Sequence, residues 1–106
     1  MSASKQKGTW FETALVQWFD RKGIVAKRIV LHGNKDEGDV DTERFSIEAK
    51  NCKAITLASW IKEAEAETIN AGKPVVVVAK RAGISDPGRS YVITTLDTFT
   101  EMMYGG

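Results

Sequence analysis

The stretch SIEAK at residues 46–50 alternates polar and apolar side chains. Successive side chains of a strand point to opposite faces, so this pattern predicts a strand that directs Ile47 and Ala49 one way and Glu48 and Lys50 the other. A strand with one apolar face must be buried against another layer of secondary structure. The pattern therefore indicates a sheet on which an acidic and a basic side chain lie side by side.

A hairpin would bring a second carboxylate to this charged face. The polar run 41–44 predicts a turn that follows a strand ending near Val40. A loop of two or four residues would pair Asp39 with Ser46, and cross-strand partners share a face. Asp39 would then project with the two charged side chains of the next strand, whereas a three-residue loop would turn it to the other side.

Two carboxylates and an amine on one face suit a site for Mg²⁺. This ion takes hard oxygen ligands, usually one or two protein carboxylates, and leaves other positions to water and phosphate. The ion would lower the pKa of a bound water, and Lys50 would steady the nucleophile or the developing negative charge. The alternative interpretation is that Asp39, Glu48 and Lys50 are ordinary charges on the wet face of a hairpin.

The remaining pattern predicts one domain built around a mixed sheet. The expected elements are a helix over 9–22, strands over 26–31, up to Val40 and over 46–50, a helix over 57–71, strands over 74–79 and 90–95, and a helix over 96–104. This order, α-βββ-α-ββ-α, predicts an α/β fold of mixed α+β type, with helices flanking a central mixed sheet. We expect a flexible arm over 1–7 and a single domain over 8–106, since a chain of 106 residues buries one core.

Composition narrows the class of protein further. A hydrophobic content of 42% and a charged content of 27% are typical of globular proteins. The longest apolar run, at 74–79, is too short to span a membrane, and no signal peptide is recognisable. The single cysteine, Cys52, excludes an internal disulfide and suits a reducing cytoplasm. We therefore expect a cytoplasmic protein with no membrane partner and no organic cofactor.

A net charge of only +1 means that any DNA contact must come from a local basic patch. The predicted DNA-contacting residues are Lys5, Lys7, Lys53, Lys80, Arg81 and Arg89, and Lys27, Arg28 and Lys50 are further candidates. For each of them alone, a solvated surface charge is the default interpretation. Glu12 has two interpretations as well. It is either a third acidic group that reaches toward Asp39 and Glu48, or a charge that favours the first helix near its N-terminus.

These features together resemble the PD-(D/E)XK nuclease superfamily and, within it, small Holliday-junction resolvases of archaeal and phage type. The resemblance rests on the order α-βββ-α-β, on Gly38-Asp39-Val40 and Glu48-Ala49-Lys50 in adjoining strands, on Gly8 and Glu12 at the first helix, and on Lys80-Arg81 before Tyr91-Val92. It extends from Gly8 to about Phe99. The chain departs from the pattern at Gly38, which stands where the name-giving proline would be.

The resemblance implies a restriction-endonuclease-like core and a magnesium-dependent endodeoxyribonuclease, with Mn²⁺ as a substitute metal. Asp39 and Glu48 would bind one or two ions, the Ala49 carbonyl would complete the metal shell, Lys50 would assist the nucleophile, and Glu12 would support the site. The resemblance also implies a homodimer that cuts branched DNA at a four-way junction, in a microbial cell or a phage-infected host. Two alternatives stay open: a repair or restriction-type nuclease on linear or nicked duplex, and a non-catalytic nucleic-acid-binding module on the same fold.

Overall fold

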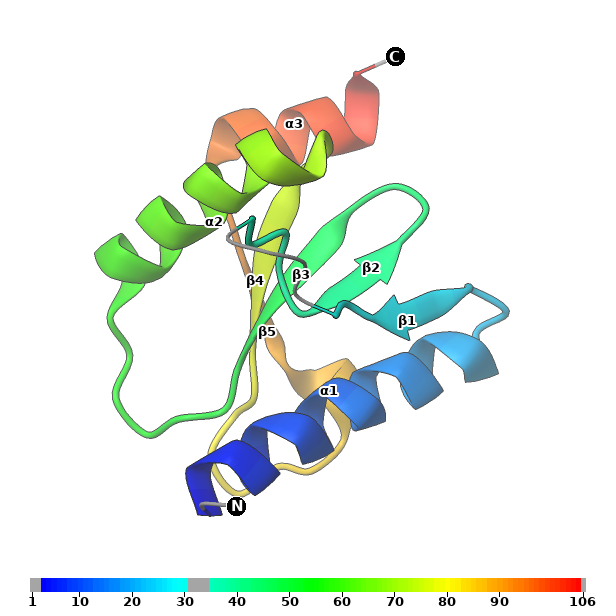
Figure 1. The fold of residues 1–106 in the computed structure, drawn as a ribbon, viewed down its shortest axis with the longest axis vertical. Coiled ribbons are helices and arrows are strands. Elements are labelled where there is room, and N and C mark those ends of the chain that lie inside the picture. The colour runs from blue at the N-terminus through cyan, green and yellow to red at the C-terminus, as the bar shows by residue number, and fades with distance from the viewer. Residues whose placement is uncertain (1–2, 31–34, 106) are drawn as a thin grey trace.

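In the part of the chain that the structure describes, five strands form one mixed sheet. The computed structural model describes residues 3–30 and 35–105, the first three of them without their side chains. The elements are α1 (Ala3–Arg21), β1 (Ala26–Arg28), β2 (Val40–Thr42), β3 (Ser46–Lys50), α2 (Leu57–Ala71), β4 (Val75–Ala79), a 3-10 turn η1 (Pro87–Arg89), β5 (Tyr91–Ile93) and α3 (Leu96–Tyr104) (Figure 1). The strands follow the order β1-β2-β3-β4-β5, with β3 and β4 parallel and the other neighbours antiparallel. The α/β mixed fold predicted from the sequence is confirmed.

The valine-rich strand β4 is buried on both faces and lies at the centre of the core. Val76 and Val78 pack against Phe11 and Leu15 of α1. The odd-numbered residues of β4 face the other way and pack against Trp60 and Ala64 of α2. Because β-branched side chains fit a pleated surface, a run of valines is well suited to a strand enclosed by two layers of helix.

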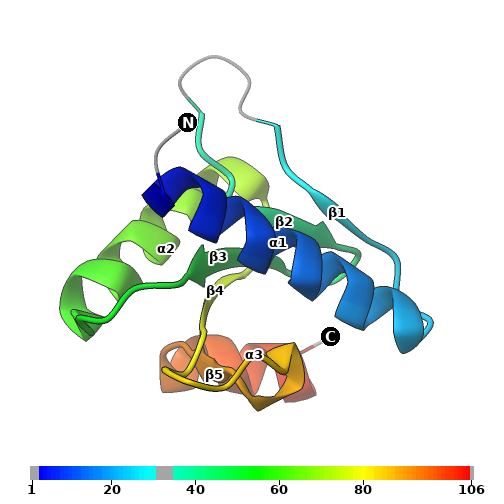
Figure 2. The same cartoon turned by 90° about the horizontal axis from the view of Figure 1, so that it is seen from below.

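The two long helices therefore cover opposite faces of the sheet. Figure 1 shows the strands passing between α1 and α2, and Figure 2 shows β5 and α3 together on one side of the molecule, away from α1. In β3, Ile47 belongs to the cluster on the α1 side. The alternation of the strand then places Glu48 and Lys50 on the α2 side. The charged face predicted for this strand is thus a surface enclosed beneath a helix.

The hairpin between β2 and β3 has a tighter turn than the sequence predicts. Asp41 pairs with Ser46, Val40 pairs with Ile47, and the Thr42 N–H donates to the Phe45 carbonyl at 2.9 Å. The strand therefore begins at Val40 instead of ending there, and the predicted pairing of Asp39 with Ser46 is wrong by two residues. Because side chains alternate with a period of two, a shift of two residues leaves Asp39 on its predicted face.

The bounds of two other elements differ from those predicted from the sequence. The first helix begins at Ala3 and not near residue 9, so residues 3–7 are helical where the sequence predicts an arm. The strand predicted over 26–31 ends at Arg28, and its last predicted residue, Leu31, lies outside the described part of the chain. The helix α2 ends as predicted, with Gly72 as a left-handed cap at φ 70°. Among the described residues, no helix has the length and apolar character needed to cross a membrane.

We predict that Gly38→Ala destabilises the protein more than Gly83→Ala. Both glycines have a positive φ, 104° and 75°, which costs a non-glycine residue about 1–2 kcal/mol. A Cβ at Gly38 would also lie 3.0 Å from the Ile47 carbonyl oxygen, whereas a Cβ at Gly83 would meet nothing within 4 Å. Urea denaturation of both variants measures the difference. Equal losses in the free energy of unfolding would contradict the close approach at Gly38.

Candidate metal centre

The middle of β3 carries a carboxylate that the fold removes from water. Glu48 is only 7% exposed, and its Oε1 has no hydrogen-bond donor among the described residues. It lies on the face of the sheet that α2 covers, between Ser46 and Lys50. Burying a carboxylate without a hydrogen-bond donor costs free energy, so a proton or a cation must replace the hydrogen bonds that water would otherwise donate to it.

Asp39 approaches the same strand from β2. Asp39 lies one residue before β2, beside the last pair of the hairpin, Val40 and Ile47. The Asp39 N–H donates to the Ile47 carbonyl at 2.7 Å, and the Ala49 N–H donates to Asp39 Oδ2 at 2.8 Å. The two backbone groups of one strand residue face the same neighbouring strand, so the Ala49 carbonyl also faces the Asp39 edge. Asp39, Glu48 and the Ala49 carbonyl thus gather in one short segment of the sheet.

Two further carboxylates, from other parts of the chain, complete the cluster. One oxygen each of Asp36, Glu48 and Glu67 lies within 4.8 Å of the other two. Glu67 belongs to α2 and is 2% exposed, and neither of its carboxylate oxygens has a donor among the described residues. Asp36 is exposed, and its Oδ1 accepts the Gly38 N–H at 2.9 Å. A loop, a strand and a helix therefore direct acidic groups to one point.

The cluster strongly favours protonated carboxyls when no cation is bound. Burial, followed by the charge of Glu48, raises the pKa of Asp39 to about 7. Burial and the neighbouring Glu48 raise the pKa of Glu67 to about 10. Burial also raises the pKa of Glu48, although the adjacent Glu67 carboxyl, which can donate a proton to Glu48 when it is protonated, acts in the other direction. Like charges in a desolvated site explain these directions, and a divalent cation would reverse them.

The donor set fits a hard divalent cation such as Mg²⁺. Among the described residues that converge there, it consists of carboxylate oxygens and one backbone carbonyl, with no sulfur or imidazole. The donorless oxygens of Glu48 and Glu67 are the positions where such an ion would compensate negative charge. Asp36, Glu48 and Glu67, whose oxygens converge, are therefore the residues that would hold it, with Asp39 and the Ala49 carbonyl beside them.

Lys50 places a cation beside this acidic cluster. Its Nζ donates to Glu63 Oε1 at 2.8 Å and lies 3.4 Å from Glu48 Oε2. Burial lowers the pKa of Lys50, but the hydrogen bond to Glu63 and the charge of Glu48 outweigh that effect and the pKa is raised. The ammonium group also lies 5.9 Å from the centre of the Trp60 ring. Lys50 therefore stays positively charged and is held between a strand and α2.

Glu12 lies near the cluster but has a partner of its own. Its Oε1 accepts from Arg28 Nε at 3.1 Å. Its charge is a smaller cause of the raised pKa of Asp39 than that of Glu48. The first turn of α1 contains no acidic residue, because the helix starts at Ala3, so the interpretation of Glu12 as an N-terminal charge is wrong.

The structure brings some of the predicted DNA-contacting residues together and separates others. Lys53, Lys80 and Arg81 line one small cavity at the end of β3 and β4. Lys7 lies at the same end, where its carbonyl accepts from Asn51 Nδ2 at 3.2 Å. Arg89 ends η1, whose Gly88 lies against Trp18 on α1. The side chain of Lys5 lies outside the described part of the structure.

Reasoning from sequence missed Asp36, Glu63 and Glu67. A signal for Glu67 exists: the buried positions of α2 are Trp60, Ala64 and Glu67, at spacings of four and three residues. A glutamate on the apolar stripe of a helix is unusual unless it is paired or binds a metal. Asp36 offers no such signal, because a polar loop gives no information on which of its side chains turns inward.

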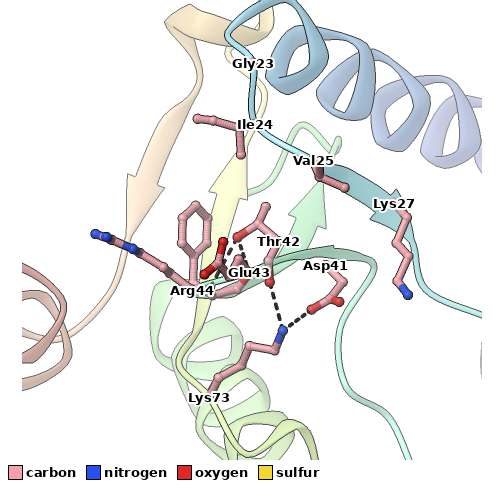
Figure 3. Close-up of a pocket in the computed structure, with 10 residues that line it drawn as sticks. Gly23, Ile24, Val25, Lys27, Asp41, Thr42, Glu43, Arg44 and Lys73 are labelled. Carbon is pink, nitrogen blue, oxygen red and sulfur yellow. Dashed lines mark hydrogen bonds and ion pairs between the residues drawn. The ribbon is translucent and has the colours of Figure 1, made fainter.

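Another cavity lies away from this cluster. It encloses about 640 Å³ at the hairpin end of the sheet, between Ile24, Val25 and the turn at Glu43 and Arg44 (Figure 3). Lys73 in its wall donates to Asp41 Oδ1 at 2.6 Å and to the Thr42 carbonyl at 2.8 Å. This cation is already paired with Asp41, and the other carboxylate in the cavity wall, Glu43, is exposed to solvent, unlike the buried carboxylates of β3 and α2.

No protein-family model, curated protein or solved structure matches this chain. The candidate metal centre therefore rests on its own geometry.

We predict that the metal-free protein loses thermal stability as the pH rises from about 6 to about 9. Unfolded carboxyls titrate near pH 4, so the raised pKa values of Asp39 and Glu67 make the folded state bind more protons in this range. The stability that those protons provide is present at low pH and is lost as the pH passes through each folded pKa. Melting temperatures in EDTA measure the slope, and Mg²⁺ should raise the melting temperature more at the higher pH.

Two glutamine variants on α2 provide the control for this slope. Glu67→Gln should flatten it, because it removes the buried titrating group. Glu65→Gln, on an exposed position of the same helix, should leave it unchanged. If the melting temperature of the native protein changed with neither pH nor Mg²⁺, this result would contradict the presence of buried, titrating carboxylates in the cluster.

Proposed function

We propose that this protein is a metal-dependent endonuclease that hydrolyses phosphodiester bonds in branched DNA, such as a Holliday junction, as a homodimer. The observation that carries the proposal is the burial of Glu48 and Glu67: Glu48 Oε1 and both Glu67 oxygens lack a hydrogen-bond donor among the described residues, and the Lys50 ammonium group lies 3.4 Å from Glu48 Oε2. Clustered acidic ligands beside one fixed cation suit hydrolysis of an anionic ester better than they suit binding alone. The resemblance to PD-(D/E)XK nucleases supports the same chemistry.

The carboxylates would hold Mg²⁺, or Mn²⁺ in its place, and fix its position on the sheet. A bound divalent metal lowers the pKa of water and offsets negative charge on phosphoryl oxygens. Asp39 is oriented by the Ala49 N–H, so one of its oxygens is held in place before any metal binds. Glu48 and Glu67 approach from a strand and a helix, which restricts the volume that a ligand can occupy.

Lys50 would act on the substrate and not on the metal. Glu63 and Glu48 hold its ammonium group from two sides, so it is positioned without free rotation. A fixed cation beside the metal would stabilise negative charge that develops on the phosphate and would orient the attacking water. Glu63 is the positioning residue for this lysine.

DNA is the substrate class that the charge distribution supports. The net charge of the chain is +1, yet Lys53, Lys80 and Arg81 gather at the end of β3 from which Lys50 projects. Positive charge beside an acidic metal centre would guide a phosphate backbone across it.

The C-terminal helix supports a dimer. None of the residues of α3 is buried, and Leu96, Phe99 and Met103 follow one stripe with exposures between 48% and 79%. This stripe is free of charge, since Asp97 and Glu101 lie on another side of the helix. Two copies related by a two-fold axis would bury the stripe against itself, and a four-way junction offers two equivalent strands to such a dimer.

We predict that Asp39→Asn and Glu48→Gln each slow DNA cleavage at least about a hundredfold, because each removes charge from the metal site. DNA affinity should not fall, since neither side chain is a phosphate contact. Asp41→Asn is the matched control for Asp39: it lies two residues further along the same strand and pairs with Lys73. Full activity of the Asp39 and Glu48 variants in a gel assay with Mg²⁺ would show that the wrong carboxylates were chosen.

We also predict that cleavage depends on branching and on metal. Labelled four-way junction should receive paired symmetric nicks with Mg²⁺ and none with EDTA, and matching linear duplex should stay intact. Equal cutting of linear duplex would instead favour a repair or restriction-type nuclease. Tight binding without cutting under any divalent metal would favour a non-catalytic module and would overturn the proposal.

A further inference from the structure

A small cavity opens beside the metal centre, beyond the ends of two parallel strands. It encloses about 270 Å³ and is lined by residues that follow β3 and β4, together with Trp60 of α2 and Tyr91 of β5. Figure 1 shows that the chain leaves β3 and β4 at the same end of the sheet, as their parallel pairing requires. The carboxyl ends of parallel strands commonly form crevices that bind ligands.

The lining of this cavity combines positive charge with flat apolar surface. Lys53, Lys80 and Arg81 contribute three cations, and no acidic residue lines it. The Arg81 guanidinium lies 5.2 Å from the centre of the Tyr91 ring, and Tyr91 is 48% exposed. The larger cavity at the hairpin differs, because Asp41 and Glu43 balance its basic residues. An anion with a planar apolar part suits the smaller cavity.

The cavity is connected to the metal centre through Lys50. The Lys80 N–H donates to the Lys50 carbonyl at 2.9 Å, and the Trp60 ring in the cavity wall lies 5.9 Å from Lys50 Nζ. That ammonium group is in turn 3.4 Å from Glu48 Oε2. A ligand in the cavity would therefore lie next to whatever occupies the metal centre.

We propose that this cavity holds one unpaired nucleotide of the DNA strand, next to the phosphate at the metal centre. Its base would stack on the Tyr91–Arg81 pair, since nucleobases stack on tyrosine rings and on guanidinium planes. Its phosphate would meet Lys53 and Lys80. The cavity, at about 270 Å³, is large enough to hold a single base. This assignment rests on the proposed function, and it specifies a substrate with an unpaired base at the cutting site.

Fluorescence anisotropy in EDTA tests the assignment without cleavage. Two labelled duplexes would be compared, one with a short bulge of normal nucleotides and one whose bulge carries abasic units. The native protein should bind the first about tenfold more tightly, because a stacked base contributes on that scale. Tyr91→Leu should reduce this ratio to about one. Tyr104→Leu, an identical change on the exposed α3, should keep it.

Three outcomes would overturn the assignment. They are equal binding of the two bulges by the native protein, the same loss of preference in the Tyr104 variant, and competition by free dAMP as strong as by the bulged strand, which would assign the cavity to a free nucleotide. Failure of this assignment and failure of the nuclease proposal give different results. Cleavage without base preference would refute the cavity alone, and base preference without cleavage under any divalent metal would refute the nuclease alone.

Discussion

Burial of Glu48 and Glu67 between β3 and α2 is the constraint on which the rest of this structure depends. Lys50 lies beside one oxygen of Glu48, but the other oxygen and both oxygens of Glu67 have no donor among the described residues, which destabilises a fold unless a proton or a cation lies between the two carboxylates. The hairpin adds Asp39 to the same place, and the loop before it adds Asp36. The core around them is ordinary, with valines of β4 between two amphipathic helices, so stability alone gives no reason for acidic groups at these positions.

The parallel pair β3 and β4 links the two sites described above. Its middle carries Glu48, and Lys50 at its end lies between the acidic cluster and the basic cavity. The acidic cluster therefore lies at the middle of this strand pair, and the basic residues of the cavity lie beyond its end. A metal-bound phosphate at the first site and the next nucleotide at the second would follow the direction of the strands, which makes the two proposals geometrically compatible.

The sequence predicted the fold and part of the cluster for definite physical reasons. Alternation in β3 and helical spacing in α2 are local patterns, and both elements formed as expected. The exact hairpin register was wrong, because turn length depends on side-chain bonds such as Thr42 to Phe45 that spacing does not reveal. Asp36 could not be predicted, since a loop has no periodicity. Glu67 could have been predicted as a member of the site, because it interrupts the apolar stripe of a helix.

Anomalous diffraction from crystals soaked in Mn²⁺ tests the central claim most directly. The account predicts a single strong region of manganese density in contact with the carboxylates of Asp36, Glu48 and Glu67, next to Asp39, and its disappearance in Glu67→Gln crystals. Density elsewhere only, or none while Glu48 and Glu67 keep their positions, would contradict a metal centre between β3 and α2.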